Sequence, residues 1–263
     1  MSFDAITAVA PAGAARIPYR LVGHGPAVIL VHGTGPGSSL WDGMVEAFAA
    51  DHTVILPELS GSEQAQDDGG PLTAELLAGQ VHAVLEHAAV GPADVVGFSL
   101  GAPVATAAAA LRPDLVHRLV AVAGWTHPGD AYLHTQMTLW QRLAADPVAF
   151  GRFATLTAFS RGHIQSIGRE GVETSSGFMR PTPGVLRQLD LNLSLDIRPL
   201  LPLVQAPALV IGCTQDATIP VENHRELHAG LAGSEYVEFD TGHVVLFEQA
   251  EQFTKLVLDF LAV

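Results

Sequence analysis

Three residues of the types that cooperate in acyl transfer lie far apart along the chain. Ser99 stands in GFSLG (97–101), a match to the G-x-S-x-G pattern, between a short apolar run and an alanine-rich segment. Asp216 follows the apolar run 206–212, and His243 follows the run 235–240. A serine hydroxyl is a poor nucleophile unless a histidine takes its proton and an acid orients that histidine. We therefore predict that Ser99 is the nucleophile, His243 the general base and later acid, and Asp216 the orienting carboxylate.

A glycine-rich segment has the features needed for the electrostatic part of the same chemistry. LVHGTGPGSS (30–39) directly follows an apolar run, and its glycines and proline favour a tight, rigid turn. Backbone N–H groups held on such a turn stabilise the oxyanion that forms when a nucleophile attacks a carbonyl carbon. We predict that the N–H groups of Thr34 and Leu100 form this oxyanion hole.

Loops at the carboxyl ends of parallel strands can bring such distant residues together. Short apolar runs alternate with helical patterns along the chain, which is typical of an α/β fold with a doubly wound, mostly parallel sheet. The predicted strands are 15–22, 26–33, 52–59, 93–99, 116–124, 206–212 and 235–240. The predicted helices are 39–50, 73–89, 100–111, 221–231 and 248–261.

The alternation of strands and helices is interrupted between residues 126 and 193, where only helical patterns occur. Asp146-Pro147 has the sequence of a helix N-cap followed by proline at the first helical position. We predict that residues 1–125 and 194–263 form one α/β core and that residues 126–193 form a helical cap over the site. An ordinary helical insertion packed on the sheet is the alternative.

Together these features resemble the α/β-hydrolase fold across essentially the whole chain. The features that match are HG at 32–33, GFSLG, Asp216 after a late strand, His243 after the last strand, and a helical insertion after the sixth strand. The resemblance implies that Ser99 sits on a sharp strand-to-helix turn, with the three side chains in the roles given above. One segment departs from the pattern, because many relatives carry an R-G-x-G-like turn where this chain has ELSGSEQ (58–64). That loop is expected to border the pocket differently.

A further group of residues is expected to line the substrate pocket. The cap is rich in aromatic side chains, so the pocket should be largely apolar. Arginines slightly outnumber acids within 126–193, whereas the rest of the chain is strongly acidic. We therefore hypothesise that Arg161 or Arg180 contacts an anionic group of the substrate, the alternative being that the arginines only solvate the outer face of the cap. The predicted substrate contacts are Gly33, Phe98, Trp125, Trp140, Phe159, Arg161, Arg180 and Val244.

The catalytic groups indicate acyl transfer without naming the acyl group. A hydrolase acting on an ester, lactone or thioester of a small molecule is the first hypothesis. HGTGPGSSLW (32–41) resembles a stretch of the carbon–carbon bond hydrolases that cleave ring-fission dienoates, and the chain also resembles enol-lactonase-like esterases in part. Those carbon–carbon hydrolases tend to have an aromatic residue where this chain has Val244, and often asparagine where it has Phe98. A carbon–carbon hydrolase or lyase is therefore the second hypothesis, and a non-catalytic small-molecule receptor the third.

Simpler roles exist for the residues of the predicted triad. Ser99 could only cap the following helix, although that would not account for the placement of the other two residues. Asp216 could only cap the turn into helix 221–231, in which case Asp130 is the alternative acid. His224 and His228 stand four residues apart, but HRELH (224–228) lacks the H-E-x-x-H order of a zinc site, so we predict a solvated helix face instead. We predict neither a metal nor another cofactor.

Composition argues against several kinds of partner. The net charge is −14 and Lys255 is the only lysine, so the chain lacks the basic clusters that bind nucleic acid or an anionic membrane surface. The N-terminal residues do not resemble a secretion signal, and no apolar run reaches the roughly 18 residues of a membrane span. The single cysteine, Cys213, is expected to be a buried packing residue. These features predict a cytoplasmic protein, and the predicted triad adds a small-molecule substrate. The oligomeric state is left open.

Overall fold

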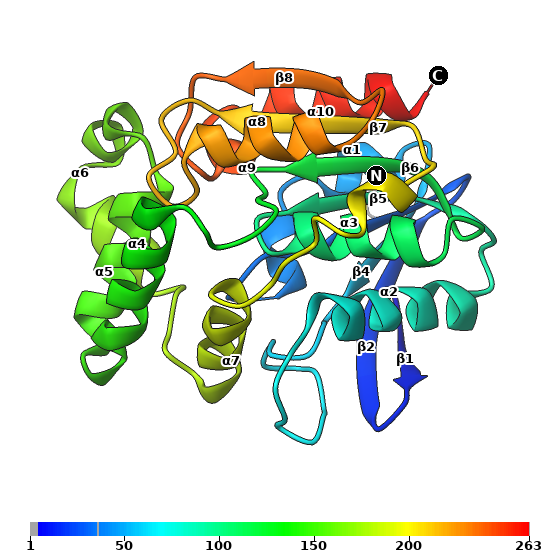
Figure 1. The fold of residues 1–263 in the computed structure, drawn as a ribbon, viewed down its shortest axis with the longest axis horizontal. Coiled ribbons are helices and arrows are strands. Elements are labelled where there is room, and N and C mark those ends of the chain that lie inside the picture. Colours follow the sequence, from blue (N-terminus) through cyan, green and yellow to red (C-terminus); the bar gives the residue numbers. More distant parts are fainter. Residues whose placement is uncertain (1–4, 36, 263) are drawn as a thin grey trace.

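The structure, a computed structural model, describes residues 5–35 and 37–262. Pro36, one of the residues predicted to stiffen the turn at 30–39, lies outside the described residues, as do residues 1–4 and 263 of the predicted core. The strands are β1 (Ile6–Ala12), β2 (Ala15–Gly23), β3 (Ala27–Val31), β4 (Thr53–Pro57), β5 (Ala93–Phe98), β6 (Val116–Val122), β7 (Ala208–Cys213) and β8 (Glu235–Phe239). They form one eight-stranded sheet in the order β1-β2-β4-β3-β5-β6-β7-β8 (Figure 1).

The sheet is parallel from β4 to β8 and antiparallel at its other edge, which confirms the predicted fold class. Strand β1 was not predicted from the sequence. Its residues ITAVAPA are rich in alanine and include Pro11, and both residue types are depleted in strands. The strand forms because a tight turn at Gly13 (φ 59°) pairs it with β2 at an edge of the sheet, where proline is tolerated.

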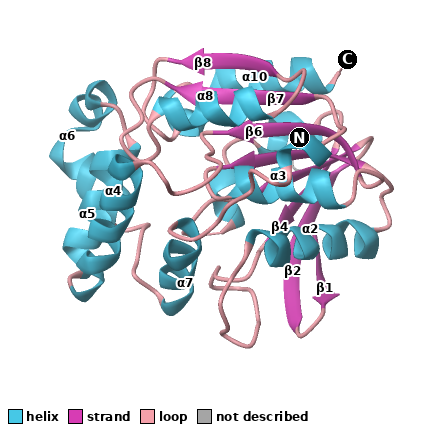
Figure 2. Cartoon of the chain, viewed as in Figure 1, coloured by secondary structure: helices cyan, strands magenta, loops and turns pink. Residues whose placement is uncertain are grey.

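Helices cover both faces of the sheet (Figure 2). They are α1 (Val45–Ala49), α2 (Ala74–Ala88), α3 (Gly101–Leu111), α8 (Val221–Gly230), α9 (Val245–Glu248) and α10 (Ala250–Leu261). Alternate residues of the buried strands enter two hydrophobic clusters: Ile29 of β3 packs with the side of α2, α3 and α8, and Val28 with the side of α1 and α10. The predicted helix 39–50 was wrong in extent, because a 3₁₀ turn (Ser38–Trp41) precedes the short α1.

The segment predicted to be a cap contains α4 (Ala131–Arg142), α5 (Pro147–Ala158), α6 (Arg161–Ser176) and α7 (Pro183–Asn192). Asp146 caps α5 by accepting hydrogen bonds from the backbone N–H groups of Val148 and Ala149, and Pro147 occupies the first turn, as predicted. The arrowheads of β6 and β8 point toward α4, α5 and α6 (Figure 1). The carboxyl ends of the strands therefore face this helical segment.

Strand β8 is an edge strand, and charged side chains lie along it. Glu235 is exposed and Glu238 pairs with Arg225 of α8 at 2.7 Å. Charges on an edge strand hinder pairing with another chain.

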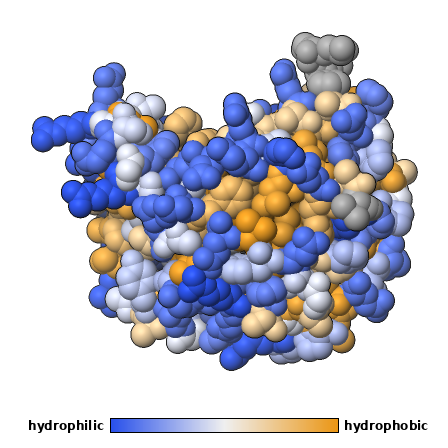
Figure 3. All heavy atoms as spheres, turned by 90° about the horizontal axis from the view of Figure 1, so that it is seen from above, coloured by the Kyte–Doolittle hydropathy of each residue, from blue (hydrophilic) through white to orange (hydrophobic). Residues whose placement is uncertain are grey.

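The face seen in Figure 3 is polar over most of its rim and has apolar side chains gathered near its centre. Among the described residues, no helix is long and apolar enough to cross a membrane.

Candidate active site

Ser99 lies on the turn between β5 and α3 in a strained backbone conformation. Its φ is 55°, in the left-handed region that non-glycine residues rarely adopt. The N–H of Ser99 donates to the carbonyl of Val122 in β6 at 2.9 Å, and its own carbonyl accepts from Ala102 at 2.9 Å. These bonds hold the turn in a conformation that costs about 1–3 kcal/mol, and strain of this kind is typical of functional sites.

The glycines on either side of Ser99 allow the strand and helix to pack closely. A Cβ atom added to Gly97 would lie 2.1 Å from the carbonyl oxygen of Gly101, and one added to Gly101 would lie 2.3 Å from that of Val31. Both contacts are with backbone atoms, which cannot move aside without displacing β3, β5 or α3. The spacing of GFSLG therefore follows from the packing of this turn as well as from its chemistry.

We expect Gly101→Ala to destabilise the fold by about 3 kcal/mol or more, because the added methyl group overlaps the backbone of a central strand. Gly79→Ala is the matched control, since Gly79 is an exposed residue within α2 and an added Cβ would meet nothing within 4 Å. That control should gain about 0.5–1 kcal/mol from the better helix propensity of alanine. Urea unfolding followed by circular dichroism measures both free energies, and equal stability of the two variants would contradict the packing argument.

The structure brings the three predicted residues into one hydrogen-bonded chain. The Nε2 atom of His243 lies 2.8 Å from the Oγ of Ser99, and its Nδ1 lies 2.6 Å from the Oδ2 of Asp216. Ser99, Asp216 and His243 are 8%, 9% and 4% exposed. In this geometry the Ser99 hydroxyl donates to Nε2 while Nδ1–H donates to the carboxylate, which is the arrangement for proton transfer from serine to histidine.

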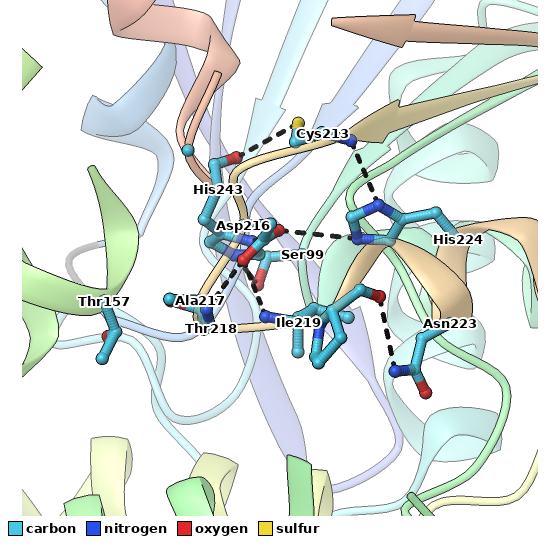
Figure 4. Close-up of polar contacts among 12 residues, drawn as sticks. Ser99, Thr157, Cys213, Asp216, Ala217, Thr218, Ile219, Asn223, His224 and His243 are labelled. Carbon is cyan, nitrogen blue, oxygen red and sulfur yellow. Dashed lines mark hydrogen bonds and ion pairs between the residues drawn. The ribbon is translucent and has the colours of Figure 1, made fainter. Parts of the chain in front are cut away.

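Backbone donors hold the carboxylate of Asp216 in place. Its Oδ1 accepts hydrogen bonds from the N–H groups of Thr218 and Ile219, each at 2.8 Å, and Figure 4 shows both bonds on the loop after β7. This leaves Oδ2 to face His243. Asp130, the alternative acid, has another role: its Oδ1 accepts from the N–H of Leu133 at 2.7 Å and caps α4.

The loop that carries His243 is joined to the helical segment on one side of Ser99. The Oε1 of Glu248 accepts from the N–H of Gly242 at 3.1 Å and from the N–H of Ser160 at 2.7 Å. The N–H of Val244 donates to the carbonyl of Ala158 at 3.2 Å. The bonds of Ser160 and Val244 therefore join the end of α5 to the segment around His243, and the bond of Gly242 holds Glu248 to the same segment.

The glycine-rich turn after β3 lies directly against Ser99. A Cβ atom added to Gly33 would be 2.9 Å from the Cβ of Ser99. The carboxylate of Glu58, at the end of β4, accepts from the Oγ of Ser38 at 2.5 Å and from its backbone N–H at 3.2 Å, which fastens the far end of the turn. The N–H groups of Thr34 and Leu100 thus belong to the two turns that adjoin the Ser99 side chain, and their binding of an oxyanion stays a prediction.

His32, at the start of that turn, is buried and has its ring fixed by two backbone groups. Its Nδ1 lies 2.8 Å from the carbonyl oxygen of Gly33 and its Nε2 accepts from the N–H of Leu59 at 3.1 Å. Burial lowers the pKa of His32 and outweighs the opposing effect of Glu58. A neutral ring with its proton on Nδ1 satisfies both bonds, so His32 joins the ends of β3 and β4.

Helix α7 contacts the same turn through two residues that were not predicted from the sequence. The Oε1 of Gln188 accepts from the N–H of Gly35 at 2.9 Å, and the Nδ2 of Asn192 donates to the Oγ1 of Thr34 at 3.0 Å. The two residues stand four apart and therefore share a helix face. That spacing was visible in the sequence, but the turn they contact lies more than 150 residues away.

The other predicted substrate contacts occupy different environments. Phe98 is buried, with its ring centroid 5.0 Å from that of His243, and Val244 is buried beside it. Trp125 is fully buried, and Trp140 packs on Phe150 at 5.4 Å between α4 and α5.

Phe159 is half-buried and stacks on His163 at 4.6 Å. Arg161 and Arg180 are exposed, and the Nε of Arg180 donates to the carbonyl of Gly177 at 3.3 Å. Contact with substrate stays a prediction for each of them.

The predicted solvated face at HRELH was wrong for His224, which is fully buried beside Asp216. His228 instead stacks on Tyr236 at 4.9 Å and bonds Ser234 at 2.8 Å. The two histidines point to different parts of the structure because α8 packs on the sheet with His224 toward the strands.

Cys213 is buried at the end of β7, as predicted, and burial raises the pKa of its thiol. Within the described residues, no group of three or more His, Cys, Asp or Glu side chains is arranged to hold a metal ion.

Comparison with known proteins places this geometry in a family. A sequence model of the alpha/beta hydrolase fold matches residues 26–250. The chain is 37% identical over 254 residues to the pyrrolizixenacetamide deacetylase of Xenorhabdus hominickii, covering 95% of this chain and 96% of that protein. It is 28% identical to the putative carbamate hydrolase RutD of Azorhizobium caulinodans, covering 94% and 96%. The crystal structure of the enol-lactonase from Burkholderia xenovorans superposes with a TM-score of 0.85 at 24% identity, covering 97% of this chain and all of that one.

Proposed function

Because the chain belongs to the alpha/beta hydrolase fold family and is a hydrolase of that family, we propose that it cleaves an ester, lactone or thioester of a small, largely apolar substrate through an acyl-enzyme. The observation that carries this proposal is the continuous hydrogen-bonded chain from the Oγ of Ser99 through His243 to Asp216. Hydrolases among its relatives support the same reaction class, including proteins named as a deacetylase and a methyl ester esterase.

In the proposed mechanism, the Oγ of Ser99 attacks the substrate carbonyl carbon while Nε2 of His243 takes the hydroxyl proton. The buried carboxylate of Asp216 stabilises the imidazolium that forms and holds its ring orientation. The N–H groups of Leu100 and Thr34 donate to the oxyanion of the tetrahedral intermediate. Collapse of the intermediate expels the alcohol or thiol, which takes the proton from Nε2. A water molecule then attacks the acyl-enzyme while Nε2 of His243 takes its proton. The second tetrahedral intermediate releases the acid, and His243 returns the proton to the Oγ of Ser99.

Residues 126–193 act as the cap in this proposal, over a core made of residues 1–125 and 194–263. The support is that this segment contacts the site on two sides of Ser99. Helix α7 bonds the turn at Thr34 and Gly35, and the end of α5 bonds the loop around His243. Substrate bound between these contacts would be shielded from water, which strengthens the electrostatic interactions of the intermediate. Phe98 and Val244 would form part of its apolar wall.

Removal of an acetyl group from nitrogen is the second candidate, because the relative at 37% identity is named pyrrolizixenacetamide deacetylase. The same triad can serve both reactions. An amide differs in its leaving group, which is expelled only if His243 protonates the nitrogen as the carbon–nitrogen bond breaks. Acetylated substrates are therefore the first set to compare, as oxygen esters, thioesters and amides of one acyl group.

The test is a panel of acyl donors together with a covalent probe. We expect hydrolysis of short aryl esters, a lactone and a thioester, and a single fluorophosphonate adduct on the intact protein by mass spectrometry, with the modified peptide containing Ser99. Cleavage of a ring-fission dienoate without ester hydrolysis would favour the carbon–carbon hydrolase instead. A protein that neither hydrolyses a panel member nor gains the adduct would contradict the proposal and favour the receptor.

A further inference from the structure

His224 is a buried histidine with no place in the triad mechanism. It lies in the second turn of α8, eight residues after Asp216, and its side chain is fully shielded from solvent. A buried polar group costs free energy unless it is hydrogen-bonded, so both ring nitrogens of His224 require partners. Figure 4 shows its ring between the backbone of Cys213 and the carboxylate of Asp216.

The two contacts determine which nitrogen carries the proton. The backbone N–H of Cys213 donates to Nδ1 at 3.2 Å, so Nδ1 is the unprotonated nitrogen. In a neutral ring the proton then lies on Nε2, and this nitrogen is 3.5 Å from the Oδ2 of Asp216. At this separation Nε2 makes no hydrogen bond to any group among the described residues. This N–H instead approaches the carboxylate oxygen that also accepts from His243.

The surroundings of the His224 ring favour its neutral form. Burial lowers the pKa of His224 to about 4, against the opposing effect of the carboxylates of Asp216, Glu238 and Glu222, while His243 lowers the pKa further. Protonation of the ring would require Nδ1 to lose the hydrogen bond from Cys213. The neutral form therefore satisfies both the backbone donor and the carboxylate.

We propose that His224 is a positioning residue for the triad, which donates Nε2–H to the Oδ2 of Asp216 and holds that oxygen in line with His243. The carboxylate side chain has no exposed surface and carries a buried charge. In the structure it has three donors, two backbone N–H groups on Oδ1 and His243 on Oδ2, and a hydrogen bond from His224 would be the fourth. A separation of 3.5 Å is long for a hydrogen bond, and hydrogen bonds of catalytic sites are often long without substrate and shorten in the transition-state complex.

The first test measures the tautomer in the unaltered protein. Spectra of the ¹⁵N-labelled imidazoles should show His224 neutral at pH 7 and at pH 5.5, with Nδ1 unprotonated and Nε2 protonated. An unprotonated Nε2, or a cationic ring at pH 5.5, would overturn the proposal. This measurement needs no substrate, so it stands apart from the proposed function, on which only the kinetic test below rests.

The second test uses side chains that reproduce one nitrogen each. His224→Asn places its amide at the position of Nδ1, so it keeps the contact with Cys213 and loses the donor to Asp216. His224→Gln places its amide at the position of Nε2 and restores that donor. We expect kcat on an aryl ester to fall about tenfold in the asparagine variant with KM unchanged, and to recover in the glutamine variant. His228→Asn is the control, and its kcat should equal that of the wild type.

A spectroscopic readout accompanies the kinetics and does not depend on turnover. The resonance of the His243 Nδ1 proton should broaden through faster exchange with water in His224→Asn and return in His224→Gln. Equal kcat and equal proton exchange in the two variants and the wild type would assign His224 a purely structural role and overturn the proposal. If no substrate is hydrolysed by the wild type, the proposed function fails, and the tautomer and proton exchange still decide the role of His224.

Discussion

Replacing Ser99 with alanine should lower kcat/KM for an aryl ester by about 10⁶-fold and abolish the fluorophosphonate adduct. The reason is that Ser99 is the proposed nucleophile and its Oγ is 2.8 Å from the base, so its removal disables the triad as a unit. The remaining rate enhancement over the uncatalysed reaction in water should come from substrate binding and the oxyanion hole alone. Single-turnover kinetics and intact-protein mass spectrometry measure the two effects.

The Ser99→Ala variant should keep the stability of the wild type to within about 1 kcal/mol, because alanine retains the same backbone strain at this turn. Ser166→Ala is the control for activity, since Ser166 is an exposed residue of α6 whose hydroxyl donates to the carbonyl of His163. That variant should match the wild type in rate and labelling. Full labelling of Ser99→Ala, at a rate equal to that of the wild type, would place the nucleophile elsewhere.

Asp216→Asn should lower kcat by about 10⁴-fold while leaving the fold intact. The cause lies in the two backbone N–H groups that point at Oδ1, from Thr218 and Ile219 at 2.8 Å each. They require an acceptor, so the asparagine amide places its oxygen there and turns its NH₂ group toward His243. That NH₂ group donates to Nδ1, which forces the proton of His243 onto Nε2. The histidine then cannot accept the proton of Ser99.

Asp130→Asn is the matched control for this charge change. Asp130 was the alternative acid, and the structure shows it capping α4 through the N–H of Leu133. Asparagine caps helices about as well as aspartate, so stability and kcat should both remain within about twofold of the wild type. Steady-state kinetics with one ester compares the two variants directly. A large loss in Asp130→Asn with none in Asp216→Asn would reverse the assignment of the orienting acid.

Strain and close packing meet at the proposed nucleophile. Ser99 holds a left-handed backbone conformation, and the two neighbouring glycines allow backbone contacts that a Cβ atom would prevent. The bonds to Val122 and Ala102 hold the turn in this conformation. The hydroxyl is thus held by a closely packed turn between β5 and α3, whereas the acid and the histidine come from loops that depend on hydrogen bonds for their orientation.

The sequence by itself was sufficient for the fold class and for the grouping of Ser99, Asp216 and His243. The reason is that each residue lies at or shortly after the end of a predicted strand, and the carboxyl ends of parallel strands lie at one edge of a sheet. The start of α5 also followed from a local signal, Asp146-Pro147. Strand β1 did not, since its composition is poor for a strand and its partner β2 stabilises it.

The tertiary structure alone decided which polar residues surround these three. Gln188 and Asn192 reach the turn at Thr34 only because α7 lies over it. His224 was expected in solvent, but the packing of α8 turns it toward Asp216. Amphipathic spacing shows which residues share a helix face. It does not show how that helix is rotated about its axis relative to a distant strand or loop. That rotation is set by the packing of the whole core, and it places His224 beside the carboxylate of Asp216.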